Sequence, residues 1–258
     1  MYQERTYRNL VEAAQLVAYR VVVKETDLMV YTATRLEDET QDLVLEQRGY
    51  VEAFIKTHPD FAKALNPWRL EGPAPGIVRD MVKAGELAGV GPMAAIAGAI
   101  AEQVGLGLLE LTDQVIIENG GDVFIKTNSS VTVGIFAGDS PLSSRIGIRM
   151  KSRPGPCAVC TSSGTIGHSL SLGNADAVCV VADSCPVADA AATAIGNRVD
   201  SAADIATAIE AGKGIEEIRG MVVIVGEKIG IWGDLEVVSP AGRTQPFSDR
   251  KKRLSFNS

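Results

Sequence analysis

Alternation of apolar and polar residues near the start of the chain predicts a pair of strands. Residues 15–33 are rich in Val, Tyr and Thr around the polar run Glu25, Thr26 and Asp27, so two strands joined by a turn are expected. Across residues 38–57 the apolar positions recur at steps of three and four after an acidic start. That spacing predicts an amphipathic helix whose first acidic residues complement its dipole.

Further helices and strands follow a turn-rich stretch. Residues 72–76 contain two prolines and form the best linker candidate. Helices are predicted over residues 76–87 and 92–104, and the second is so rich in Ala and Gly that we expect it to be buried. Strands over 131–136 and 146–150 are expected to continue the sheet begun by earlier strands. The other expected elements are strands over 115–118, 123–126 and 176–182, helices over 186–198 and 202–211, and a hairpin over 221–232.

The order of these elements predicts an α+β fold in which sheets of mixed or antiparallel strands are flanked by helices. We expect residues 1–240 to form one compact unit, with two joined lobes as an open alternative. Residues 241–258 are polar and lack periodicity, so a mobile tail is expected there.

Charge and hydropathy argue against nucleic-acid and membrane partners. The formal net charge is −7, whereas a nucleic-acid surface needs a basic face that neutralises phosphates. Polar residues interrupt any apolar stretch after Met1, and the longest apolar run, residues 90–102, is too short to cross a bilayer. We therefore expect a cytoplasmic protein.

Four cysteines lie close together in the sequence, and two interpretations of them remain open. The first two have Cys-x-x-Cys spacing, which occurs in metal knuckles, but the last two are separated by five residues and the first pair lacks a turn. Small, reduced core residues are favoured, with a metal or redox site as the alternative. The four are Cys157, Cys160, Cys179 and Cys185.

Two glycine-containing segments at the ends of predicted strands are candidates for ligand binding. Paired glycines in the first permit positive φ and close approach of a ligand, and its N–H groups suit an anion. The same residues equally predict a hairpin turn. The second is a hydroxyl-rich loop that suits phosphate but is also common without a ligand. The segments are Asn119, Gly120, Gly121 and Asp122, and Thr161, Ser162, Ser163 and Gly164.

A third segment offers oxygen ligands for a metal. Asp189 and Thr193 are four residues apart, so on a helix they share one face and suit a hard cation such as Mg²⁺. Alternatively, Asp189 complements the dipole of its own helix from the first turn. His168, one of two histidines, is a candidate site residue or a structural hydrogen-bonding residue.

Taken in order, the three segments resemble the ApbE-like flavin transferases. A small-residue helix precedes a strand, Gly-Gly-Asp, Thr-Ser-Ser-Gly, a further strand and Ala-Asp-x-x-x-Thr-Ala. Members of this superfamily use Mg²⁺ to move flavin mononucleotide (FMN) from flavin adenine dinucleotide (FAD) onto a Thr or Ser of another protein. The resemblance covers roughly residues 90–200 and implies an ApbE-like fold.

The resemblance also implies a role for each candidate residue. Asn119 to Asp122 would contact the flavin, Thr161 to Gly164 would form the pocket loop, and Asp189 and Thr193 would bind Mg²⁺. Asp189 and His168 would be catalytic, with His168 in place of a histidine that the transferases carry. The implied cofactors are Mg²⁺ and FAD, and the implied partners are a flavin nucleotide and an acceptor protein.

Two departures from the family pattern leave the activity open. The small-residue helix begins with Gly91, Pro92 and Met93, where the transferases have an acidic residue, a glycine and a lysine. Residues 166–175 replace their His-Ile-x-x-Pro segment. Flavin transfer, ligand binding without catalysis, and a cysteine-based metal or redox protein therefore remain as alternatives.

Overall fold

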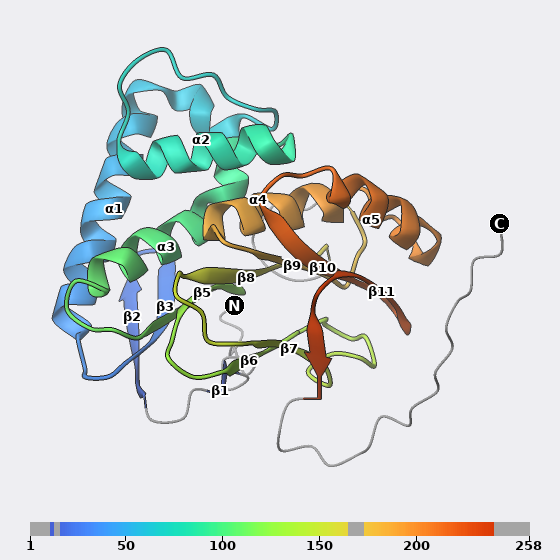
Figure 1. The fold of residues 1–258 in the computed structure, drawn as a ribbon. Coiled ribbons are helices and arrows are strands. Elements are labelled where there is room, and N and C mark those ends of the chain that lie inside the picture. The colour runs from blue at the N-terminus through green and yellow to red at the C-terminus, as the bar shows by residue number, and fades with distance from the viewer. Residues whose placement is uncertain (1–10, 13–15, 165–172, 240–258) are drawn as a thin grey trace.

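The computed structural model describes residues 11–12, 16–164 and 173–239, which form three layers (Figure 1). An eight-stranded sheet lies in the middle, helices cover one of its faces, and a four-stranded sheet covers the other. This arrangement confirms the predicted α+β fold with sheets flanked by helices. The predicted tail and His168 lie outside the described residues.

The strands of the central sheet are all antiparallel to their neighbours and follow the order β11-β10-β9-β8-β5-β4-β3-β2. Their bounds are β2 Val17–Val23, β3 Thr26–Thr32, β4 Val115–Asn119, β5 Asp122–Lys126, β8 Cys157–Ser162, β9 Ala177–Ala182, β10 Ile218–Val225 and β11 Lys228–Gly233. The smaller sheet has the order β1-β6-β7-β12. Its strands are β1 Val11–Glu12, β6 Val131–Gly134, β7 Gly147–Met150 and β12 Glu236–Val238.

The helices begin and end close to the predicted positions. The α-helices are α1 Glu37–Thr57, α2 Gly76–Ala88, α3 Ile96–Leu108, α4 Cys185–Gly196 and α5 Ile205–Lys213. Short 3₁₀ helices are η2 Pro59–Lys63, η3 Pro92–Ala95 and η4 Ala202–Asp204. Because η3 leads directly into α3, the predicted small-residue helix is divided between a 3₁₀ and an α segment.

The placement of β6 and β7 corrects one expectation. They do not continue the central sheet but pair with each other and with β1 and β12. Their buried side chains, among them Val131, Val133 and Ile148, pack against the reverse face of the central sheet. Apolar alternation marks a half-buried strand but does not reveal which sheet it joins.

Burial on both faces explains why the central strands are almost wholly apolar. Along β4 and β5, Ile117 and Phe124 face the helices, whereas Ile116 and Ile125 face the smaller sheet. Those side chains alternate because successive residues of a strand point to opposite faces. One sheet therefore contributes to two hydrophobic cores.

The same alternation separates the three cysteines on strands, and the fourth, Cys185, begins α4. Cys160 and Cys185 belong to the core under the helices, with 3.5 Å between their sulfur atoms, whereas Cys157 and Cys179 belong to the core under the smaller sheet. Burial raises the pKa of Cys157 and of Cys185 to about 11, so both thiols are protonated at neutral pH. All four are buried, as expected, and they do not converge on one metal position.

Glycines let α3 lie directly against its neighbours. A Cβ added to Gly98 would lie 2.5 Å from the carbonyl oxygen of Cys185, and one added to Gly105 would lie 2.3 Å from Phe124 Cδ1. Side chains larger than hydrogen are therefore excluded at both positions. The expectation that this small-residue helix is buried is confirmed.

In the part of the chain that the structure describes, no single helix is long and apolar enough to span a membrane. The pair formed by α2 and the η3–α3 segment passes that test together but is bent by 106°. Most of the apolar residues of these helices are buried in the core.

Replacing Gly98 by Ala should destabilise the fold by about 1–3 kcal/mol, since a methyl group there overlaps the backbone of α4. Gly49→Ala is the matched control, because Gly49 is exposed on α1 with nothing within 4 Å of an added Cβ. That change should stabilise the protein by up to about 1 kcal/mol. Urea unfolding of both variants measures the difference, and equal effects would contradict the packing described.

The Glu102 carboxylate accepts a 2.6 Å hydrogen bond from the N–H of Cys185 at the start of α4. Burial raises the pKa of Glu102 from 4.5 to about 7, so the folded state binds this proton more tightly than the unfolded state. The contribution of Glu102 to stability is therefore lost as pH rises from the unfolded pKa of 4.5 through the folded pKa of about 7, by at most about 3 kcal/mol.

Glu102→Gln keeps the acceptor oxygen and removes the titration. Its free energy of unfolding, compared with wild type at pH 5 and pH 8, should therefore depend less steeply on pH. Glu86→Gln, on the exposed side of α2, is the control. Identical pH dependence for wild type and Glu102→Gln would show that this carboxyl group does not titrate as described.

Candidate functional site

The double-glycine turn joins β4 to β5 and lies against the end of β8. Gly120 and Gly121 have φ values of 69° and 112°, which glycine adopts without strain. The N–H of Thr161 donates to the Gly121 carbonyl at 3.2 Å, and a Cβ on Gly121 would lie 3.3 Å from the Thr161 carbonyl oxygen. The first two predicted segments are therefore in direct contact.

Glu118, which sequence analysis missed, fixes the shape of this turn. The buried Glu118 carboxylate accepts a 2.9 Å hydrogen bond from the N–H of Gly121. One of the N–H groups expected to suit an anion is thus already bonded within the chain. The sequence signal was the single carboxylate inside the apolar strand 115–119.

Asn119 links the turn to α3. Its side-chain nitrogen donates to the carbonyl oxygen of Ala97 at 2.9 Å, and the side chain is buried. Ala97 lies in the first turn of α3, and its carbonyl oxygen has a second lone pair that can accept this bond beside the helical one. The position of the turn relative to α3 is therefore set by a specific bond.

Asp189 reaches the same helix end from α4. Its carboxylate accepts a 2.9 Å hydrogen bond from the N–H of Gly98 and a further bond from the N–H of Ala97. These are N–H groups of the first turn of α3, which an acceptor outside the helix must satisfy. Asp189 thus complements the dipole of α3. The simpler sequence interpretation assigned it to the dipole of its own helix instead.

Asp122 and Asp189 form an acidic pair at the centre of the site. Burial, and then the neighbouring Asp189 carboxylate, raise the pKa of Asp122 well above its usual range. Burial raises the pKa of Asp189 to about 7, although the N–H groups of Gly98 and Ala97 act in the opposite direction. Holding both groups as anions costs free energy, which a proton or a bound cation would relieve.

The hydroxyl-rich loop runs from the end of β8 toward the end of α4. Thr161 and Ser162 are the last residues of β8 and Ser163 follows. The Gly164 N–H donates to the carbonyl oxygen of Ala175 at 2.9 Å. A Cβ on Gly164 would lie 1.9 Å from the Gly173 carbonyl oxygen, and one on Gly173 would lie 2.0 Å from that of Gly196. The backbone at Gly173 is therefore packed directly against those at Gly164 and Gly196, where α4 ends.

Thr193 lies one helical turn beyond Asp189 on α4 and is partly buried. The two side chains share a helix face, as their spacing predicted. The structure thus brings together the Asn119–Asp122 turn, the end of β8 and Asp189, with Thr193 following on α4. Their roles in binding stay predictions.

A cavity of about 310 Å³ adjoins the turn and was not predicted from sequence. Its size is at the lower end for small-molecule sites. Asn119 and Ala97 line it beside apolar residues of α1, η3 and α3, and Arg48 lies at its polar edge, where its guanidinium donates to Thr26 at 2.7 Å. The remaining lining residues are Glu25, Val51, Glu52, Ile55, Met93, Ile96 and Ile100.

Solved structures with a similar fold include two ApbE proteins. The ApbE protein from Thermotoga maritima gives a TM-score of 0.54 at 14% identity, covering 84% of this chain and 96% of that one. The flavin transferase ApbE from Vibrio cholerae gives a TM-score of 0.52 at 12% identity, covering 85% and 97%. At such identities the similarity shows the shared fold.

Curated relatives are closer in sequence. The UPF0280 protein of Methanococcus aeolicus is 43% identical over 201 residues, which are 76% of this chain and 81% of the relative. The UPF0280 protein of Methanocaldococcus jannaschii is 39% identical over 226 residues, covering 84% and 90%. The family model described as AbpE bacteria matches residues 8–231. The predicted ApbE-like resemblance is thereby confirmed, and the chain belongs to the AbpE bacteria family.

Proposed function

We propose that this protein binds a flavin nucleotide together with Mg²⁺ beside the double-glycine turn and transfers FMN from FAD to a Ser or Thr of an acceptor protein. The observation that carries the proposal is the pairing of Asp122 and Asp189, two carboxylates with raised pKa values next to that turn. Such pairs are concentrated at functional sites. The family and its flavin-transferase structural neighbours supply the ligand class.

The residues present fit a magnesium ion. Mg²⁺ prefers oxygen ligands, keeps several waters, and is commonly held by one or two carboxylates plus substrate phosphates. The Asp189 carboxylate and Thr193 hydroxyl are oxygen donors on one face of α4, and the Asp122 carboxylate adds negative charge nearby. When bound, Mg²⁺ would neutralise the pyrophosphate of FAD and act as a Lewis acid.

The remaining groups of the site suit binding and orientation. The Gly120 and Gly121 backbone leaves room for close approach of the nucleotide, and the hydroxyls of Thr161, Ser162 and Ser163 are donors for phosphate oxygens. In the transfer step, the acceptor hydroxyl oxygen bonds to the phosphorus of the FMN half. The bond from that phosphorus to the AMP oxygen breaks, AMP leaves, and the hydroxyl proton passes to a base.

Asp189 and His168 are the proposed catalytic residues, with His168 as the base for this proton. Bound Mg²⁺ would keep the Asp189 carboxylate ionised, because it competes with the proton for the same oxygens. Asp189 also receives backbone N–H bonds that hold its carboxylate in one orientation.

Flavin binding without transfer is the second candidate. It is favoured by the segment that enters α3, where Gly91, Pro92 and Met93 stand in place of the acidic, glycine and lysine pattern of the transferases. The missing lysine removes a positive charge, and positive charge favours the binding of phosphate. Both candidate functions use the same flavin site, so an assay of FMN transfer distinguishes them.

Binding of FAD should be tighter with Mg²⁺ than without it. Because Mg²⁺ competes with protons for carboxylates, the gain should be larger at pH 8 than at pH 6. Asp189→Asn keeps an acceptor for Gly98 but removes the charge, so it should reduce the gain by at least ~10- to 100-fold, the loss typical of removing a metal's supporting residues.

Titration followed by flavin fluorescence measures these affinities, with Asp139→Asn in the exposed turn after β6 as the control. Equal affinity with and without Mg²⁺, in both wild type and Asp189→Asn, would remove the proposed metal site.

Transfer should be visible as covalent modification of an acceptor. Incubation with FAD, Mg²⁺ and Ser- or Thr-containing peptides should increase the peptide mass by one FMN-derived group and release one AMP per modified peptide. Mass spectrometry and chromatography of AMP measure the two products. Tight FAD binding with neither product would select the non-catalytic candidate.

A further inference from the structure

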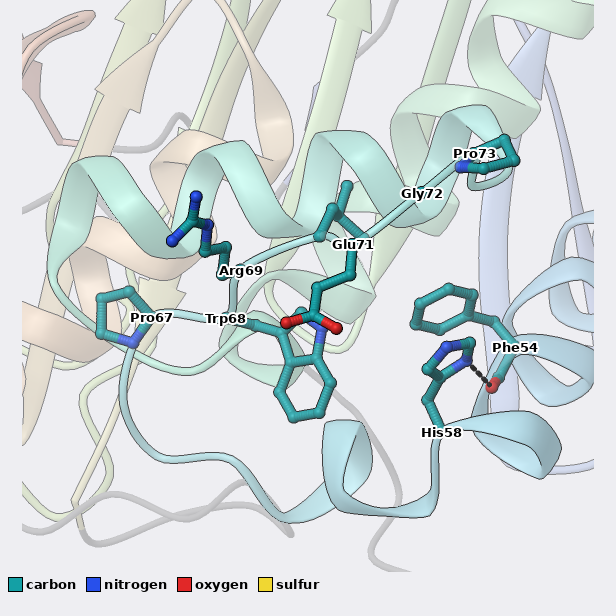
Figure 2. A pocket seen from close by; sticks show the side chains of 9 residues that line it. Phe54, His58, Pro67, Trp68, Arg69, Glu71, Gly72 and Pro73 are labelled. Carbon is teal, nitrogen blue, oxygen red and sulfur yellow. Dashed lines mark hydrogen bonds between the residues drawn. The ribbon is translucent and has the colours of Figure 1, made fainter.

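A second cavity, of about 570 Å³, lies between the end of α1 and the segment 67–73 (Figure 2). It shares no lining residue with the cavity beside the double-glycine turn. Its size is typical of small-molecule sites. The lining residues are Phe54, His58, Pro67, Trp68, Arg69, Leu70, Glu71, Gly72 and Pro73.

Aromatic rings form a connected base for this pocket. Phe54 and Phe61 meet edge to face at 5.0 Å between centroids, and Phe61 meets Trp68 in the same way at 5.6 Å. His58 stacks on Phe54 at 4.2 Å. Because Phe61 is fully buried beneath the other rings, their positions are set by packing.

Segment 67–73, which forms the other wall of the pocket, is held by hydrogen bonds near both of its ends. The Gly91 N–H donates to the carbonyl oxygen of Leu65 at 2.9 Å, and the Arg79 guanidinium donates to that of Ala74 at 2.8 Å. Gly72 lies between these points with a φ of 151°, which other residues rarely adopt. The pocket is therefore preformed rather than a gap beneath a loose loop.

Two side chains of the pocket lining, His58 and Glu71, offer hydrogen-bond acceptors. Nδ1 of His58 is engaged with the Phe54 carbonyl oxygen at 3.2 Å and with the Thr57 hydroxyl at 2.9 Å, which leaves Nε2 for a ligand. In Figure 2 the Glu71 side chain extends from segment 67–73 toward the Trp68 indole, while the Arg69 guanidinium points away from His58. Within the described residues, no Lys or Arg forms an ion pair with Glu71.

We propose that this pocket binds an alkylammonium group, either of a free amine or of a lysine side chain on another protein. Aromatic faces attract such a cation, most strongly at Trp. The Glu71 carboxylate supplies the opposite charge and the apolar walls accept the alkyl chain. A phosphate group would be repelled by Glu71, so this site is distinct from the proposed nucleotide site and its test is independent of flavin binding.

Trp68 is a direct reporter of occupancy. The chain has two tryptophans, Trp68 and Trp232, so the full-length variant Trp232→Phe leaves Trp68 as the sole indole. Titration with n-butylammonium or tetramethylammonium chloride, at ionic strength held constant with NaCl, should change Trp68 fluorescence saturably. 1-Butanol, an uncharged analogue of similar length, should give no saturable change.

Glu71→Gln in the same background should weaken ammonium binding by about tenfold, because a charge-assisted contact is lost. Glu86→Gln, an equivalent change on the exposed side of α2, should leave binding unchanged. Matching thermal midpoints for both variants verify folding. No saturable response to either ammonium salt, or equal affinities in Glu71→Gln and its parent, would overturn the proposal.

A lysine-containing peptide capped at both ends distinguishes the two sources of the ligand. Binding of the peptide with an affinity similar to that of n-butylammonium supports a protein side chain as the occupant. Binding of the free ammonium alone supports a small amine. Both results sustain the ammonium site, whereas equal binding of a peptide with acetylated lysine would overturn it, since acetylation removes the charge.

Discussion

The hydrogen bonds from the first turn of α3 to the Asp189 carboxylate organise the candidate site. They join α4, which follows β9, to α3, which precedes β4, across 91 residues of sequence. The bond is accessible because Gly98 has no Cβ, which would otherwise lie 2.9 Å from that of Asp189. Asn119 binds the carbonyl oxygen of Ala97 in the same turn. A single helix end thus positions both the acidic residue and the glycine turn.

This arrangement has an energetic cost. Burying a carboxylate is unfavourable unless charge or hydrogen bonds compensate, and two neighbouring carboxylates, Asp122 and Asp189, compound the cost. Backbone N–H groups offset part of it at Asp189. At Asp122, hydrogen bonds with the Cys160 thiol and the Thr161 backbone offset part of it as well.

Much of the fold could be predicted from sequence because local patterns determine it. The helix over 37–57 and the hairpins over 17–32 and 218–233 follow from periodicity and turn residues. Assignment of β6 and β7 to a separate sheet could not be predicted, since their partners β1 and β12 lie at opposite ends of the chain. Of the candidate site, the sequence predicted the segments whose residues are adjacent to one another, 119–122 and 161–164. Glu118 and Arg48 were missed because only tertiary contacts reveal what their side chains bind.

The smaller sheet has a consequence for synthesis on the ribosome. Its strand β7 pairs on one side with β6, which is close in sequence, and on the other with β12, the last described strand. Strands β2 to β5 can pair while the chain is still being made, whereas β7 keeps an open edge until residues 236–238 have left the exit tunnel. Completion of the second hydrophobic core is therefore a late step in the folding of the chain.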